Sequence, residues 1–285
     1  MTPAHSFNQE QHARWNGADG EFWARHYERL DRVLAPINDP LLKFAAPEPG
    51  SSVLDVGCGC GELTLEIARI VGPSGHVTGI DISQPMLARA RERLRGLGNA
   101  SLRLSDAAAL PLEGTGAGLI VSRFGVMFFG DPIAAFLNLR SGLRPDGRVR
   151  FASWRPIQEN PWMQIPLHAV YEHVPRPPKP GPEEPGPFSF ADPDRVTRIL
   201  TRAGFTAPVF TPLDIQFDLS AGGTFEDAVT QAADMGPSRR LLEGQSDEIR
   251  AAARESIRRV LTPHASSAGV KLPGAVWLVA AERAD

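Results

Sequence analysis

The feature that most constrains the fold is a glycine-rich turn that follows a short apolar strand. The segment Val53 to Gly61 reads VLDVGCGCG, and its glycines alternate at Gly57, Gly59 and Gly61 before a helical pattern begins. Free backbone N–H groups at a helix N-terminus stabilise an anionic group, and glycine lets a ligand approach the backbone closely. The turn therefore predicts a site for the anionic part of a ligand, and a pyrophosphate and an amino-acid carboxylate both fit it.

Strand-like segments and helical patterns alternate around this turn. Such alternation is typical of βαβ units, so we expect an α/β fold with a mainly parallel sheet. The strands of this part are predicted at Ser52 to Val56, His76 to Asp81, Ser101 to Ser105, Gly118 to Ser122 and Arg148 to Trp154.

Beyond Trp154 the pattern changes and helical segments dominate. The loop Pro175 to Pro187 carries seven prolines and is expected to be semi-rigid. The other elements predicted there are a helix at Asn160 to Val174, a helix at Asp192 to Ala203, a strand at Val209 to Leu219, a mostly helical insertion and a terminal strand at Ala275 to Ala281.

Composition excludes several classes of function. The 285 residues include 30 Lys and Arg against 33 Asp and Glu, a formal charge of -3 that gives no attraction to phosphate backbones. No apolar run reaches the roughly 18 residues that span a bilayer, so we expect a cytoplasmic protein without nucleic-acid or membrane partners. Cys58 and Cys60 are expected to be reduced thiols, and no metal site is predicted.

Carboxylates at strand ends narrow the ligand. Asp81 closes the second strand, twenty residues after Gly61, where it could accept hydrogen bonds from both hydroxyls of a ribose. Ile82 and Met86 could flank an adenine, and Asp106 could accept from its amine. A nicotinamide site is the nearest rival, but its G-x-G-x-x-G pattern would need glycine at the position of Glu62.

Several segments together resemble the successive motifs of class I S-adenosylmethionine-dependent methyltransferases: VLDVGCGCGELTLEIA, GIDISQPMLARAR, SDAAALP and LRPDGRVRFASW. With WNGADGEFW, SRFGVMFFGDP, ENPW and VWLVAAERA, the likeness extends to a bacterial group related to the ubiquinone/menaquinone-type enzymes. This resemblance implies a Rossmann-like seven-stranded sheet in the order 3-2-1-4-5-7-6, whose last strand is antiparallel. It also implies S-adenosyl-L-methionine as the cofactor.

The resemblance implies a division of the chain and a set of cofactor contacts. We expect a helical lid at 1–40, the cofactor-binding core at 41–154, a cap helix and Pro-rich loop at 155–190, and the rest of the sheet at 191–285 with a helical insertion at about 220–272. The expected cofactor-binding residues are Trp15, Asp55, Gly57, Cys58, Gly59, Asp81, Ile82, Met86, Asp106, Ala107, Ser122, Arg123 and Phe124.

Residues that act on the acceptor are harder to identify, because in methyl transfer the cofactor supplies the leaving group. An amphipathic helix is predicted from about Gly20 to Pro36, and on it Tyr27 carries a hydroxyl that could orient or deprotonate an acceptor. His168, in the predicted cap helix, is the second candidate catalytic residue. Arg239 and Arg240 are interpreted as solvated helix charges.

The sequence thus predicts methyl transfer to a small, aromatic or polycyclic metabolite, of which an indole-type or other secondary metabolite is the narrower hypothesis. C-methylation of a quinone-type precursor, a nicotinamide-dependent oxidoreductase and a cofactor-binding protein without catalysis are the alternatives. Nucleic-acid methylation is disfavoured, because Ser122-Arg123-Phe124-Gly125 stands where those amino-methyltransferases carry Asn or Asp before Pro-Pro-aromatic. A homodimer is compatible with the sequence.

Overall fold

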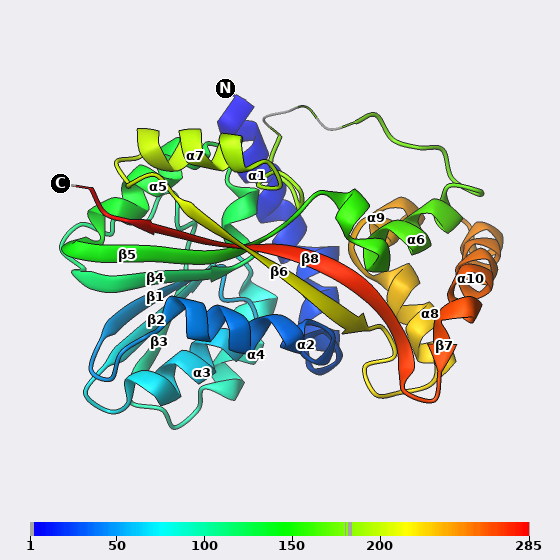
Figure 1. The fold of residues 1–285 in the computed structure, drawn as a ribbon, viewed down its shortest axis with the longest axis horizontal. Helices are drawn as coiled ribbons and strands as arrows, with labels where there is room; N and C mark the ends of the chain where they lie inside the picture. The colour runs from blue at the N-terminus through cyan, green and yellow to red at the C-terminus, as the bar shows by residue number, and fades with distance from the viewer. Residues whose placement is uncertain (1–2, 180, 182–183, 285) are drawn as a thin grey trace.

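A central sheet carries the fold, and its main strands follow the order β3-β2-β1-β4-β5-β8-β6 (Figure 1). The structure is a computed structural model that describes residues 3–179, 181 and 184–284. The strands are β1 (Ser52–Val56), β2 (His76–Asp81), β3 (Ala100–Leu104), β4 (Ala117–Arg123), β5 (Leu143–Trp154), β6 (Val209–Asp218), β7 (Ala265–Ser266) and β8 (Gly269–Glu282).

The direction of the strands confirms the predicted topology. β1 pairs in parallel with β2 and β4, and the parallel pairing continues to β3 and β5. β8 lies between β5 and β6 and is antiparallel to both. The predicted terminal strand is longer than expected, and the two-residue strand β7 pairs with its beginning.

Helices cover both faces of the sheet and extend beyond one end of it. Figure 1 shows α2, α3 and α4 on one face and α5 with α7 on the other, while α6, α8, α9 and α10 form a cap around the far ends of β6 and β8. The helices are α1 (Pro3–Asn16), α2 (Ala18–Ala45), α3 (Glu62–Val71), α4 (Gln84–Arg93), η1 (Gly125–Phe128), α5 (Pro132–Ser141), η2 (Ile157–Glu159), α6 (Pro161–Val170), α7 (Pro193–Arg202), α8 (Phe225–Asp234), α9 (Gly236–Leu242), α10 (Asp247–Leu261) and η3 (Thr262–His264).

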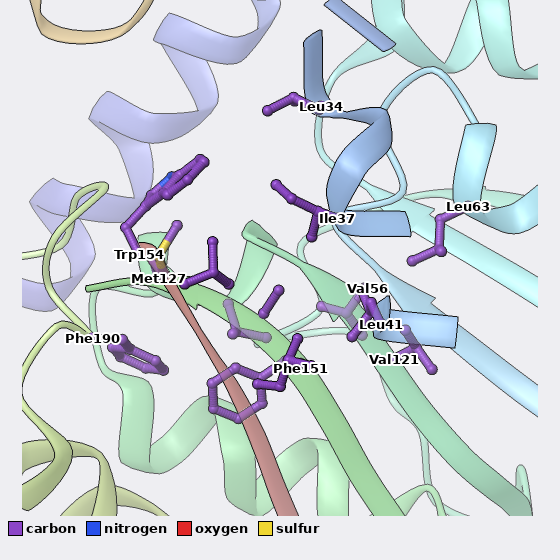
Figure 2. Packing of buried hydrophobic residues seen from close by; sticks show 14 of the residues in the cluster. Leu34, Ile37, Leu41, Val56, Leu63, Val121, Met127, Phe151, Trp154 and Phe190 are labelled. Atoms are coloured by element: carbon purple, nitrogen blue, oxygen red, sulfur yellow. The ribbon is translucent and has the colours of Figure 1, made fainter. Parts of the chain in front are cut away.

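Helix α2 corrects the prediction that Pro36 ends the leading helix. The helix runs on to Ala45 with Pro36 inside it, and its one non-helical residue is His26. A proline removes one backbone hydrogen bond, but Ile37 and Leu41 beyond it are completely buried and continue the apolar stripe. Figure 2 shows both side chains directed into the core. Burial of this stripe offsets the lost hydrogen bond, so the helix continues.

The remaining predicted elements match the observed ones to within a few residues at their ends. Residues 180, 182 and 183 of the predicted loop Pro175 to Pro187 lie outside the described residues. In the described part of the chain, every helix is too short or too polar to cross a bilayer.

Candidate active site

A cavity of about 470 Å³ opens at the carboxyl ends of the parallel strands. In open α/β sheets, ligands bind at this edge, where the strand order reverses on either side of the first strand. One side of the cavity, here called the sheet wall, consists of the loops after β1, β2, β3 and β4. The opposite side, the cap wall, is contributed by α2, α6, α9 and residues next to them.

The glycine turn fits tightly between β2 and β4. Gly57 and Gly59 have φ of +72° and +55°, a region that favours glycine. A Cβ on Gly57 would lie 2.6 Å from Cα of Gly125. The backbone N–H groups of Gly57 and Cys58 both donate to the carbonyl of Ile80, which fixes the position of the turn relative to β2.

Asp81 connects the turn to the next loop. Its Oδ2 accepts from the backbone N–H of Gly59 at 2.8 Å, and its Oδ1 accepts from that of Ser83 at 2.8 Å. Burial raises the pKa of Asp81, and the two amide hydrogen bonds act in the opposite direction. A carboxylate oxygen can accept a further hydrogen bond, so Asp81 can still bind hydroxyl groups of a ligand in the cavity that it lines.

Asp55 and Asp106 are the other two predicted carboxylates of the sheet wall. Asp55 is 1% exposed, accepts from Thr64 Oγ1 at 2.6 Å, and has its pKa raised by burial to about 6. Asp106 accepts from the side-chain amide of Asn8 at 3.1 Å. All three carboxylates therefore face one cavity from the ends of three neighbouring strands.

Helix α1, within the segment 1–40 for which the sequence predicted a helical lid, contributes residues such as Asn8 and Trp15 to the lining of this cavity. Its Asn8 also accepts from the backbone N–H of Gly130 at 3.2 Å. Ser83 Oγ donates to the carbonyl of Trp15 at 2.6 Å, and Asn16 donates to the carbonyl of Ile82 at 2.8 Å. The loops that follow β2, β3 and β4 are thus all fastened to α1.

A charged network closes the sheet wall near α2. Arg123 donates to Glu62 at 2.7 Å and to Asn38 at 2.6 Å. Asp31 pairs with Arg93 and lies 3.8 Å from Arg123, and burial, followed by the charge of Glu62, raises its pKa to about 6. Sequence reasoning missed the acidic members, since no local pattern links α2 to the glycine turn.

Nearly all the residues expected to contact the cofactor line the cavity. Ser122 is the exception, because it is completely buried behind the wall. It donates to the carbonyl of Val56 and accepts from the N–H of Gly125, so it supports the turn from behind. The expected residues that do line the cavity are Trp15, Asp55, Gly57, Cys58, Gly59, Asp81, Ile82, Met86, Asp106, Ala107, Arg123 and Phe124.

The two candidate catalytic residues occupy different places. Tyr27 lines the cavity, but its hydroxyl donates to Glu28 at 3.1 Å, and this bond raises the pKa of Tyr27. His168 is exposed on the outside of α6, beside the ring of Tyr171, and is not among the residues around the cavity. The prediction for His168 is therefore corrected: the apolar face of α6 turns inward and carries His168 outward.

The cap wall is largely apolar and aromatic. The ring of Phe124 stacks on Trp154 with centroids 4.1 Å apart, and Trp154 contacts Trp162 of α6 at 5.3 Å. Arg239 and Arg240 of α9, interpreted from the sequence as solvated, also lie on this wall, and this interpretation is wrong. Further cap-wall residues are Phe22, Met163, Met235 and Pro237, while Phe128 and Phe129, which follow β4, add aromatic rings to the sheet wall.

Comparison with known proteins identifies a family for this part of the chain. A family model described as a methyltransferase domain matches residues 47–204, which is more than half of the chain and includes β1 to β5. Nocamycin O-methyltransferase of Saccharothrix syringae is 40% identical over 116 residues, which cover 40% of this chain and 41% of that protein. Demethylmenaquinone methyltransferase of Staphylococcus aureus is 30% identical over 131 residues, covering 44% and 54%.

These matches span about half the length of the curated relatives. Among solved structures, phosphoethanolamine N-methyltransferase 2 of Haemonchus contortus aligns with a TM-score of 0.57 at 15% identity, covering 100% of this chain and 60% of that one. At this identity the likeness concerns the fold alone.

Proposed function

Since the chain belongs to the methyltransferase domain family, whose methyl donor is S-adenosyl-L-methionine, we propose that it transfers a methyl group from that donor to a small aromatic or polycyclic metabolite. The observation that carries this proposal is the contrast within one cavity. Three carboxylates line its sheet wall, whereas rings such as Trp154 and Trp162 line its cap wall.

The sheet wall fits the polar groups of the donor. Asp81 would accept from the ribose hydroxyls, Asp106 from the adenine amine, and Asp55 with the glycine turn would hold the methionine part. When bound, S-adenosyl-L-methionine supplies an activated methyl group on a sulfonium, together with a neutral thioether leaving group. The donor set supports this assignment, because buried carboxylates bind hydroxyl, amine and ammonium donors strongly.

The cap wall would hold the acceptor and keep water out. Apolar pockets position flat acceptors by burial, and such positioning accounts for much of the catalysis of a displacement reaction. Tyr27 remains our candidate for orienting the acceptor through its ring, because its hydroxyl is already bonded to Glu28. Its raised pKa keeps the phenol protonated near neutral pH, which disfavours a role as the base.

Two acceptor classes are favoured by the relatives. Similarity to nocamycin O-methyltransferase favours a secondary metabolite, within which an indole-type acceptor is our narrower hypothesis. Similarity to demethylmenaquinone methyltransferase favours C-methylation of a quinone-type precursor as the second candidate. A nicotinamide-dependent oxidoreductase gains no support from either relative.

Two measurements test the proposal. Calorimetric titration should detect S-adenosyl-L-methionine binding and no NADH binding; the opposite result would overturn the cofactor assignment. A mass-spectrometric screen across indoles, quinones and phenols should then find a product heavier by one methylene unit, with S-adenosylhomocysteine formed in equal amount. If the protein binds the donor but forms no S-adenosylhomocysteine with any acceptor, it is a binding protein without catalysis.

A further inference from the structure

Helix α9 places two neighbouring arginines on the cap wall. Arg239 pairs with Asp19 at 3.3 Å and lies over the ring of Phe22, 4.3 Å from its centroid. Arg14 of α1 pairs with the same Asp19, which is 6% exposed. The buried carboxylate of Asp19 is therefore already paired with two guanidinium groups.

Arg240 is the third arginine of this group. Among the described residues, the side chain of Arg240 makes no hydrogen bond or ion pair, although Arg240 is half-buried and lines the cavity. Burial lowers the pKa of Arg240 and the charge of Arg14 acts in the same direction, while the charges of Asp19 and Glu243 act in the opposite direction. A guanidinium nevertheless stays protonated in proteins. In the part of the chain that the structure describes, the cap wall thus holds a partly desolvated cation whose neighbouring carboxylates, Asp19 and Glu243, form no ion pair with it, an arrangement that a bound anion would stabilise.

The contrast with Arg123 indicates which ligand this anion belongs to. Arg123, on the sheet wall, is paired with Glu62 and bonded to Asn38. Arg240, on α9, lines the cavity together with the apolar residues Met235 and Pro237 of the same segment, and α9 packs on α6 and α8. The unpaired cation is thus found on the side that the proposed function gives to the acceptor.

We propose that Arg240, supported by Arg239, binds an anionic group of the methyl acceptor, so that the substrate class is an aromatic or polycyclic acid. This inference rests on the proposed function. The group that Arg240 would bind is a carboxylate. Such a carboxylate could belong to the acceptor or to the methionine end of the donor. The experiment separates these two sources.

The test uses two fluorescent probes with the same ring skeleton. 8-Anilinonaphthalene-1-sulfonate carries an anion, and N-phenyl-1-naphthylamine does not. Both are titrated against the full chain, with and without S-adenosylhomocysteine, and energy transfer from the four cavity tryptophans, Trp15, Trp23, Trp154 and Trp162, reports probe bound close to them. Arg240→Gln should reduce the affinity for the anionic probe about tenfold, which corresponds to one charge-assisted hydrogen bond. It should change the affinity for the neutral probe by no more than about twofold.

Matched variants separate recognition of charge from packing. Arg240→Lys keeps the charge and should recover most of the affinity for the anionic probe. Arg202→Gln on α7, an exposed arginine that does not line the cavity, should change neither probe. Circular dichroism melting curves establish that each variant is folded.

Three outcomes would overturn the inference. If Arg240→Gln weakened the binding of both probes equally, Arg240 would have a structural role. If it left the affinity for the anionic probe unchanged, Arg240 would have no role in binding. A loss of S-adenosylhomocysteine affinity in Arg240→Gln, with anionic-probe binding retained, would assign Arg240 to the donor's carboxylate. If the unmodified chain fails to bind S-adenosylhomocysteine, the proposed function fails, while the probe comparison without that ligand still reports on Arg240.

Discussion

The two walls of the cavity are built in different ways. On the sheet wall, Asp55 and Asp81 lie in the last two residues of their strands and Asp106 lies just after its own. Backbone amides hold two of them, because Asp81 accepts from Gly59 and Ser83 and Asp106 accepts from Ala108. The cap wall gathers side chains from α2, α6 and α9, which are far apart in sequence. Under the proposed function, binding of the donor would therefore depend mainly on the turns at the strand ends, whereas recognition of the acceptor would depend on how distant helices pack.

The largest effect is expected where the sheet wall is most tightly packed. Gly57→Ala should reduce the free energy of unfolding by about 3 kcal/mol, because the left-handed backbone costs about 1–2 kcal/mol and the overlap with Gly125 adds a similar amount. Gly222→Ala is the control, since Gly222 also has positive φ (+79°) but has no atom within 4 Å of its added Cβ. Urea unfolding of both variants measures the difference, and equal losses would contradict the packing argument.

Asp81→Ala should weaken binding of S-adenosyl-L-methionine by about 1–3 kcal/mol, as expected for lost charge-assisted hydrogen bonds. The variant also leaves the amides of Gly59 and Ser83 without their acceptor. Calorimetry with the folded variant tests this prediction. An unchanged affinity would show that the donor does not depend on the sheet wall.

A smaller effect is expected in the pH dependence of S-adenosyl-L-methionine binding. The pKa of Asp55 is about 6, so its carboxylate is mostly ionised at pH 7 and mostly protonated at pH 5. If the ionised form holds the donor's ammonium, affinity should fall up to about tenfold from pH 7 to pH 5. Asp55→Asn should flatten this dependence. Any slope that survives belongs to another group, of which Asp31, also with a pKa of about 6, is the nearest candidate.

The smallest effects are expected at His168 and Tyr27, the two residues that the sequence indicated as candidate catalytic residues. Because His168 is exposed away from the cavity, His168→Ala should leave turnover within about twofold, in line with surface substitutions. Tyr27→Phe should likewise retain most of its turnover, because the hydroxyl is bonded to Glu28. Initial-rate measurements on an identified acceptor decide both cases, and a loss above tenfold for either variant would restore it to the mechanism.

The strand order and the role of Asp55 were implied by the resemblance to class I methyltransferases, whereas the glycine turn and the carboxylates Asp81 and Asp106 were predicted from the residues themselves, because each lies in a short motif at a strand end. The sequence did not predict that α2 continues past Pro36, since burial of Ile37 and Leu41 is a tertiary effect. The place of Arg240 on the cap wall was missed for a similar reason. Its environment depends on α1 and α2, more than 190 residues earlier in the chain.

The bonds that Asn8, Trp15 and Asn16 make with the loops after β2, β3 and β4 have a consequence in time as well as in affinity. Because residues of α1 line the cavity together with the sheet wall, we predict that the residence time of a bound ligand depends on how often this helix opens. Loop and helix opening limits the turnover of many enzymes. Here the pace of one catalytic cycle would be set by breaking a few hydrogen bonds at the entrance, far from the atoms that exchange the methyl group.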